Sequence, residues 1–109
     1  MQRGDVVVVA TNGDYGKPRP AVILQSDALP PAHQSVVIVQ FTSDLAVADF
    51  RVTIEPHADN GLRSRSQLMA DKPVTVRRDR IRQVIGHLSR EEMAELTRAV
   101  AFVIGLADT

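Results

Sequence analysis

Ser35-Val36-Val37-Ile38-Val39-Gln40-Phe41 is the stretch of this sequence that decides the fold. It is apolar at nearly every position and rich in β-branched residues. A short run of this composition is typical of a strand that is covered on both faces. We therefore expect a sheet in which this segment is an inner strand.

Strand patterns occupy most of the first two-thirds of the chain. Phe50-Arg51-Val52-Thr53-Ile54-Glu55 alternates strictly, which predicts a strand with Phe50, Val52 and Ile54 facing inward. Further strands are expected over residues 5–10, 20–24, 66–70, 74–76 and 83–88. Turn-forming residues separate these strands, so the sheet is built from short, sharply connected segments.

The final segment has a helical period instead. Ser89-Arg90-Glu91-Glu92 is a capping box, with Ser89 as the N-cap and Glu92 three residues later. Apolar residues then recur at helical spacing: Met93, Leu96, Val100, Val103, Ile104 and Ala107. We predict a helix over residues 90–106 whose apolar stripe packs on the core. The fold class is thus mainly β with a C-terminal α-helix, in the form of a strongly bent sheet or SH3-like small barrel.

Length and composition limit the class of protein. The 109 residues fit a single domain, 1–109, with one modest core. There is no cysteine, which excludes disulfides and thiolate metal sites. No apolar run approaches the roughly 18 residues that span a bilayer. We expect a cytoplasmic protein with no membrane contact.

The charges are balanced overall but unevenly distributed. Lysine plus arginine and aspartate plus glutamate number 13 each. Four arginines lie within six positions: Arg77, Arg78, Arg80 and Arg82. Such a cluster indicates either a phosphate-binding surface or an ordinary solvated face, and the sequence leaves both open. Zero net charge argues against strong binding of nucleic acid without regard to sequence.

Metal and nucleotide-cofactor chemistry find no support in the motifs. His33, His57 and His87 lie far apart, with no metal-ligand spacing around them. Gly13 and Gly16 lead into a strand, whereas a phosphate-binding glycine loop precedes a helix. We expect neither a metal nor a cofactor.

A pair of polar residues at strand ends is the candidate for chemistry. In Lys17-Pro18-Arg19-Pro20, the two prolines stiffen the backbone on either side of Arg19 at the start of a strand. Thr42 closes the strand that begins at Ser35. If the two strands are antiparallel neighbours, a guanidinium and a hydroxyl meet at one edge and suit a phosphodiester. A threonine at a strand end is also ordinarily structural, and spacing alone does not decide between the two.

Several motifs in order along the chain resemble the MazF/PemK toxins, the endoribonuclease halves of bacterial toxin–antitoxin pairs. They are Arg3-Gly4-Asp5-Val6-Val7, Arg19-Pro20-Ala21-Val22-Ile23, Thr42, Gln67-Leu68-Met69-Ala70-Asp71 and Val103-Ile104-Gly105-Leu106. The resemblance covers nearly the whole chain. It implies the plasmid toxin fold shared by CcdB and MazF and a homodimer.

The resemblance also implies an activity. It is metal-independent, sequence-specific cleavage of single-stranded RNA, which inhibits translation and growth. Arg19 and Thr42 match the catalytic positions of the family. The expected reaction is attack of the ribose 2′-hydroxyl on the adjacent phosphate, with Arg19 stabilising charge and Thr42 positioning the phosphate.

Four more residues are expected to contact RNA. Lys17 and Ser43 flank the two catalytic positions, and Tyr15 can stack on a base or pack on the barrel instead. Asp71 lies where some relatives have a proton-accepting aspartate. Met69 stands where those relatives have an arginine, so the resemblance carries over to Asp71 only in part.

The resemblance implies a cognate antitoxin as well. Its disordered, acidic tail is expected to lie across the active groove and to meet Arg63, Arg65 and the arginines of residues 77–82. Two other functions remain open. One is a toxin of the same fold that poisons DNA gyrase, although residues 106–109 hold no aromatic side chain. The other is a noncatalytic SH3-like RNA-binding module, for which an aromatic content of 4% supplies few stacking platforms.

Overall fold

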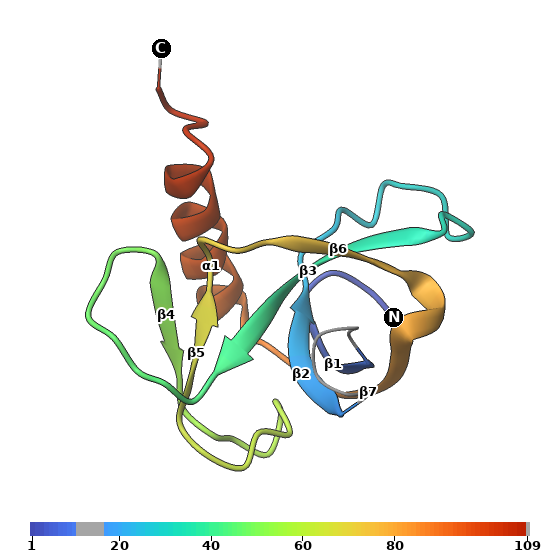
Figure 1. Cartoon of the computed structure of the whole chain (residues 1–109), viewed down its shortest axis with the longest axis horizontal. Coiled ribbons are helices and arrows are strands. Elements are labelled where there is room, and N and C mark those ends of the chain that lie inside the picture. The colour runs from blue at the N-terminus through green and yellow to red at the C-terminus, as the bar shows by residue number, and fades with distance from the viewer. Residues whose placement is uncertain (11–16, 109) are drawn as a thin grey trace.

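The computed structural model describes residues 1–10 and 17–108, which form a mainly antiparallel sheet and one C-terminal helix (Figure 1). The strands are β1 (Asp5–Ala10), β2 (Pro18–Ile23), β3 (Ser35–Thr42), β4 (Arg51–Ile54), β5 (Ser66–Met69), β6 (Val74–Arg77) and β7 (Ile81–His87). A short 3-10 turn, η2 (Arg78–Arg80), joins β6 to β7, and the helix is α1 (Arg90–Val103). Each strand predicted from the sequence is present, and no strand end is shifted by more than two residues.

β3 is the central strand of the sheet, as its composition predicts. The strand order is β4-β5-β3-β2-β1-β7, and β6 also pairs with β3. β2 runs along one side of β3, while the other side pairs first with β6 and then, from Phe41 on, with β5. Because β3 changes partner along its length, the sheet bends strongly and curls into a barrel-like shape (Figure 1).

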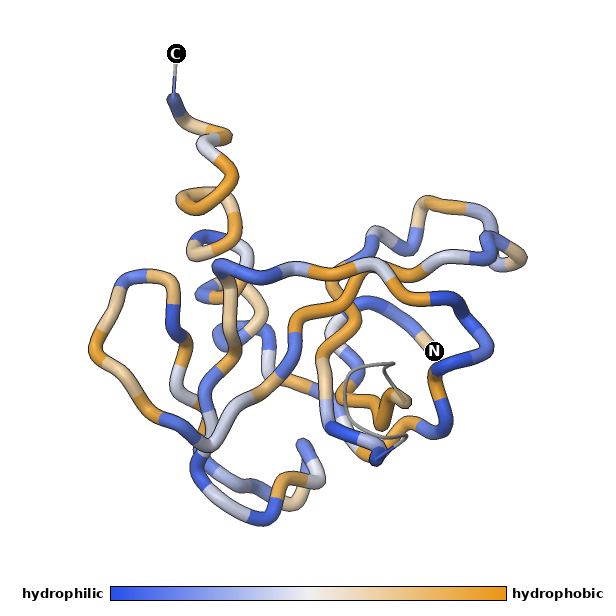
Figure 2. The backbone as a smooth tube through the Cα atoms, in the orientation of Figure 1, coloured by the Kyte–Doolittle hydropathy of each residue, from blue (hydrophilic) through white to orange (hydrophobic). Residues whose placement is uncertain are grey.

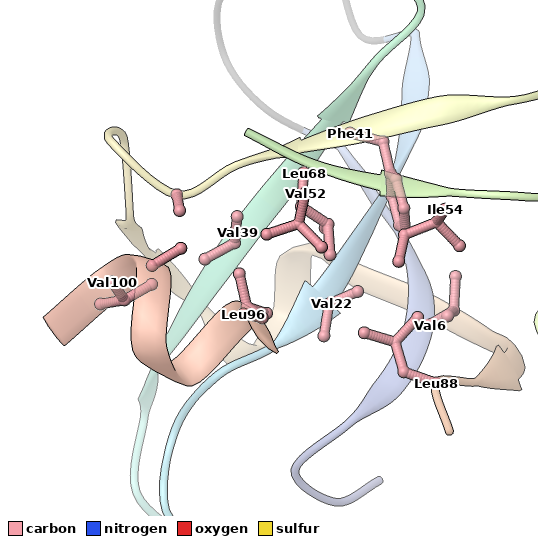
Figure 3. Close-up of a cluster of buried hydrophobic side chains, with 12 residues drawn as sticks. Val6, Val22, Val39, Phe41, Val52, Ile54, Leu68, Leu88, Leu96 and Val100 are labelled. Atoms are coloured by element: carbon pink, nitrogen blue, oxygen red, sulfur yellow. The ribbon is translucent and has the colours of Figure 1, made fainter. Parts of the chain in front are cut away.

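The two faces of the bent sheet cover two hydrophobic clusters. Successive residues of β3 alternate between them, with Ile38 in one and Val39 in the other. The first cluster lies inside the curl of β1, β2 and β3: Val7, Val9, Ala21, Ile23, Val36 and Ile38. The second lies between the sheet and α1, where Leu96 and Val100 meet Val22, Val39 and Leu68 (Figure 3). The prediction that this segment is covered on both faces is confirmed.

β4 keeps its predicted alternation, with one difference. Val52 and Ile54 are buried, and Thr53 and Glu55 are exposed. Phe50 lies just before the strand and is half-buried, because the chain there is still turning into the sheet.

The helix begins as predicted and ends earlier. The Ser89 hydroxyl accepts from the Glu92 N–H at 3.1 Å, and the Glu92 carboxylate accepts from the Ser89 N–H at 2.8 Å. At the other end Gly105 has φ = 71°, the Gly105 N–H donates to the Phe102 carbonyl, and the Leu106 N–H donates to the Ala101 carbonyl. This is a Schellman motif, which stops the helix at Val103 and not at residue 106.

The predicted apolar stripe of the helix is only partly core. Leu96 and Val100 are buried, but Ile104 is 60% exposed and Ala107 is exposed. The end of α1 projects beyond the sheet, so these residues have no sheet beneath them (Figures 1 and 2). Three large apolar side chains are exposed there: Phe102, Ile104 and Leu106. Within the described ranges, no helix has the length and apolarity needed to cross a membrane.

Candidate active site

Arg19 and Thr42 line the same cleft, which has a volume of about 430 Å³. β2 and β3 are antiparallel, with Ala21 opposite Gln40 and Val22 opposite Val39. Continuing this register by two residues sets Arg19 opposite Thr42. The antiparallel pairing assumed in the sequence analysis is thus confirmed, and it brings the two residues to one edge. We call this hollow the Arg19 cleft.

The cleft opens where the pairing of β2 with β3 stops. In this part of β2, the stretch from Pro18 to Pro20 pairs with β1 alone, and pairing with β3 starts at Ala21. A proline has no N–H to donate, so it cannot extend a hydrogen-bonded ladder. The strand starts at Pro18, earlier than predicted, and holds the exposed Arg19 between two fixed φ angles.

Thr42 is half-buried at the end of β3 and is held by a local hydrogen bond. Its Oγ1 accepts from the Asp44 N–H at 3.1 Å. This bond uses an oxygen lone pair, so the hydroxyl proton can still be donated to a ligand. Ser43, the next residue, also lines the cleft and is exposed.

The remaining lining residues are uncharged. They are Pro20, Gln40, Phe41, Ser64, Ser66 and Met69. Of the described residues that line the cleft, Arg19 alone has a charged side chain. A single guanidinium among hydroxyl groups can bind one phosphate and donate hydrogen bonds to its oxygens.

The other predicted contact residues are placed differently. Lys17 is exposed just before β2 and does not line the cleft. Asp71 lies in the turn after β5, half-buried, and the cleft lining does not include it. Its Oδ1 is buried with no hydrogen-bond partner in the described part of the chain. Tyr15 lies outside the described residues. The structure therefore brings Ser43 to the same cleft as Arg19 and Thr42, whereas Lys17 and Asp71 are not among the lining residues.

Sequence reasoning missed a residue that holds the loop after Thr42. Gln67 is 6% exposed on β5, opposite Thr42. Its side chain accepts from the Ala46 N–H and donates to the Ala46 carbonyl, both at 2.9 Å, and it donates to Thr53 Oγ1 at 3.2 Å. Arg51 donates to the Gln67 amide oxygen at 3.2 Å and to a carbonyl of the same loop at 2.9 Å. Gln67 directly precedes the apolar run Leu68-Met69-Ala70 in a predicted strand. A polar side chain in such a buried strand needs hydrogen-bond partners, and this was the signal that could have indicated that Gln67 holds a loop.

Arg65 and part of the arginine cluster of residues 77–82 form ion pairs or hydrogen bonds within the chain. Arg65 forms an ion pair with Glu55 at 2.7 Å, and this hydrogen-bonded carboxylate raises the pKa of Arg65. Arg77 pairs with Asp79 at 2.7 Å, and Arg78 donates to a backbone carbonyl at 2.7 Å. Over residues 1–10 and 17–108, no three histidine, aspartate or glutamate side chains gather closely enough to hold a metal ion.

Comparison with known proteins gives consistent matches. Residues 2–104 match the family described as "PemK-like, MazF-like toxin of type II toxin-antitoxin system". The chain is 40% identical over 109 residues to "Probable endoribonuclease MazF" of Mycolicibacterium smegmatis, covering 98% of this chain and 99% of that protein.

Solved structures share the fold. An endoribonuclease in complex with its cognate antitoxin from a mycobacterial species has a TM-score of 0.83 at 23% identity, covering 97% of this chain and 96% of that one. The Mycobacterium tuberculosis toxin MazF-mt6 has a TM-score of 0.80 at 21% identity, covering 93% and 96%. The predicted fold, a small bent sheet with a terminal helix, is confirmed.

Proposed function

Since the chain belongs to the PemK-like, MazF-like toxins of type II toxin–antitoxin systems, we propose that it is an endoribonuclease acting on single-stranded RNA in the Arg19 cleft. The observation that carries this proposal is that Arg19 and Thr42, from two paired strands, line one cleft. A guanidinium and a hydroxyl that face one hollow can hold a single phosphodiester between them.

The proposed reaction is an internal transesterification. The ribose 2′-oxygen bonds to the adjacent phosphorus and the bond from phosphorus to the 5′-oxygen breaks. The 2′-hydroxyl loses a proton to solvent and the leaving 5′-oxygen takes one up. The products are a 2′,3′-cyclic phosphate and a free 5′-hydroxyl, and the reaction needs no metal ion.

The two residues act on the phosphate as negative charge builds on it. The Arg19 guanidinium donates to the non-bridging oxygens, and its charge stabilises the crowded phosphorane. Thr42 donates its hydroxyl proton to the phosphate while the Asp44 N–H fixes its oxygen. The rigid mounting of both groups means that little reorganisation is needed at the moment of reaction.

The proposal extends to the cellular role expected of this family. The protein cleaves mRNA in the cytoplasm and so blocks translation and growth, and an antitoxin with a disordered acidic tail inhibits it. It acts as a homodimer. The exposed Phe102, Ile104 and Leu106 support a contact between copies, because a protein of this size seldom leaves such a cluster open to water.

The test is cleavage of labelled single-stranded RNA by the purified protein in EDTA. We expect fragments with 2′,3′-cyclic phosphate and 5′-hydroxyl ends. Arg19→Ala should abolish cleavage while the circular dichroism spectrum stays unchanged. Arg65→Ala is the matched control, because Arg65 is an exposed arginine that does not line the cleft. Cleavage that survives in both Arg19→Ala and Thr42→Ala contradicts the proposal, as does cleavage only with added magnesium.

A further inference from the structure

A second cleft adjoins the Arg19 cleft, and we propose that it binds a nucleotide of the RNA next to the cleaved linkage. It has a volume of about 500 Å³ and shares Pro20, Ser64 and Ser66 with the Arg19 cleft. This inference rests on the proposed function. We call the hollow the Arg63 cleft.

Continuity between the clefts gives an RNA strand a path. Three residues line both clefts: Pro20 on β2, Ser64, and Ser66 at the start of β5. A strand with its scissile phosphate at Arg19 can therefore pass along these residues and place a neighbouring nucleotide in the second hollow. The volume lies in the range of sites that hold a small molecule such as a nucleotide.

The lining of the Arg63 cleft has the chemistry that a nucleotide requires. Val8, Leu62 and Ile85 are half-buried and supply an apolar surface for a base. Gln83 is exposed and offers an amide donor and acceptor to the base edge. Arg63 is exposed and can bind a phosphate. RNA recognition of this kind, through unstacked bases and single phosphates, is typical of single strands.

Arg63 differs from its neighbour Arg65 in having its charge available. The Arg65 guanidinium is held by Glu55 through two contacts, at 2.7 Å and 3.1 Å. For Arg63, no ion pair or side-chain hydrogen bond is found within residues 1–10 and 17–108. A phosphate at the cleft therefore has no carboxylate in this part of the chain to compete with for Arg63.

The wall that carries Arg63 is held in place before any ligand binds. Asn60 is 2% exposed, and its side-chain oxygen accepts from the backbone N–H groups of His57 and Leu62 at 3.1 Å and 3.0 Å. Its amide donates to a backbone carbonyl at 2.9 Å. Gly61 has φ = 70°, and a Cβ there would lie 2.4 Å from the Ile85 carbonyl oxygen. The turn therefore packs closely on β7. Because it is already ordered, ligand binding loses less conformational entropy.

A nucleotide fits these residues better than an acidic peptide does. Arg63 is the one charged residue among the described residues that line this cleft. A segment of several carboxylates would need several unpaired cations, whereas one nucleotide needs one cation, an apolar surface and a polar edge group.

The experiment compares Arg63→Ala, Gln83→Ala and the control Arg65→Ala after the cleavage site has been mapped from fragment ends. Each protein is assayed on a short RNA with the scissile linkage alone and on the same RNA extended by three nucleotides at both ends. For the wild type we expect a higher kcat/KM on the extended RNA. In Arg63→Ala, the ratio of kcat/KM on the extended RNA to kcat/KM on the short RNA should fall about tenfold. The slope of log kcat/KM against log salt concentration should become shallower by about 0.7, because one phosphate contact is lost. Arg65→Ala should keep the wild-type preference for the extended RNA and the wild-type salt slope.

An abasic substitution identifies the bound nucleotide. In the wild type, removing the base at one flanking position should raise KM, and in Gln83→Ala the same removal should have little further effect. Binding is also measured by anisotropy, on the extended RNA with a 2′-deoxy group at the cleaved linkage.

The outcomes separate the two proposals. If the wild type does not cleave RNA but its binding depends on Arg63 and not on Arg65, the proposed function fails and the nucleotide site stands. If the wild type cleaves and Arg63→Ala matches Arg65→Ala, the site is overturned. It is equally overturned if Arg63→Ala weakens binding of a polyglutamate peptide and leaves the preference for extended RNA unchanged.

Discussion

The middle of β3 and its C-terminal end are built in opposite ways. Around Ile38 the strand is paired on both sides, with Ile23 of β2 and Val74 of β6, and the side chain is fully buried. At Thr42 the pairing with β2 has stopped, and the strand borders a cleft. The same strand therefore carries core residues in its middle and the proposed catalytic residue Thr42 at its end.

This difference teaches where a small sheet can place a binding site. A fully paired strand offers no backbone groups and no space to a ligand. Pro18 and Pro20 end the ladder on one side of β2, and the gap that results is lined by polar side chains, among them Arg19, Thr42 and Ser43. The comparison predicts that substitutions near Ile38 lower the free energy of unfolding, while substitutions near Thr42 lower the rate of RNA cleavage.

The largest expected effect is in the middle of β3, where the strand is paired on both sides. Ile38→Ala removes buried methyl groups between two strands and leaves a cavity, so we expect a loss of about 2–5 kcal/mol in the free energy of unfolding. Urea titration followed by circular dichroism measures it. Ile38→Val, which removes one methylene, should lose about 0.5–1.5 kcal/mol. A change below 0.5 kcal/mol for the alanine variant contradicts this account of the core.

At the open end, Thr42→Val keeps the shape of the side chain and removes its hydroxyl. We expect kcat/KM on RNA to fall about a hundredfold, as for loss of one donor to a developing oxyanion, with a small change in unfolding free energy. Thr42→Ser keeps the hydroxyl and should retain most of the activity. Equal activity of the valine and serine variants rules out hydrogen bonding by Thr42 in the reaction.

Gln67→Ala tests how the buried part of the sheet supports the Arg19 cleft, because the buried Gln67 of β5 holds the loop that follows Thr42. Without the amide, the Ala46 N–H and carbonyl lose their partners and the loop is no longer fixed. We expect kcat to fall about tenfold with a smaller change in KM. Thr53→Val is the control, since it removes one of the bonds of Gln67 at 3.2 Å and leaves the loop contacts. A similar loss of kcat in Thr53→Val would show that general stability, not loop position, matters.

The smallest expected effect concerns the N-cap of α1, which belongs neither to the paired middle of β3 nor to the Arg19 cleft. Ser89→Ala removes the hydroxyl that accepts from the Glu92 N–H, and we expect a loss of about 1 kcal/mol in unfolding free energy. RNA cleavage at 25 °C should stay at the wild-type rate. Thermal unfolding and the cleavage assay measure the two quantities, and a loss of cleavage without a loss of stability contradicts the expectation.

The placement of the predicted site residues relative to the cleft has a physical cause. Arg19 and Thr42 line one cleft, as expected, because both lie at strand ends and an antiparallel pairing brings such ends together. Lys17 and Asp71 are near the same strands in sequence, but both lie outside them, where the direction of a side chain does not follow the alternation of a strand. Gln67 was missed because its partners are backbone groups of a loop 21 positions away.

The sequence by itself determined the local elements: β-branched apolar runs and, in β4, strict alternation specified the strands, and the capping box and helical period specified where α1 starts. These signals lie within a few residues of one another, so local physical chemistry is enough to read them. Only the tertiary structure decided that the β2–β3 ladder stops at Ala21, that the Arg19 and Arg63 clefts adjoin, and that α1 projects past the sheet. Each of these depends on register and packing between segments far apart along the chain, and the free energy that selects them is a sum over many weak contacts.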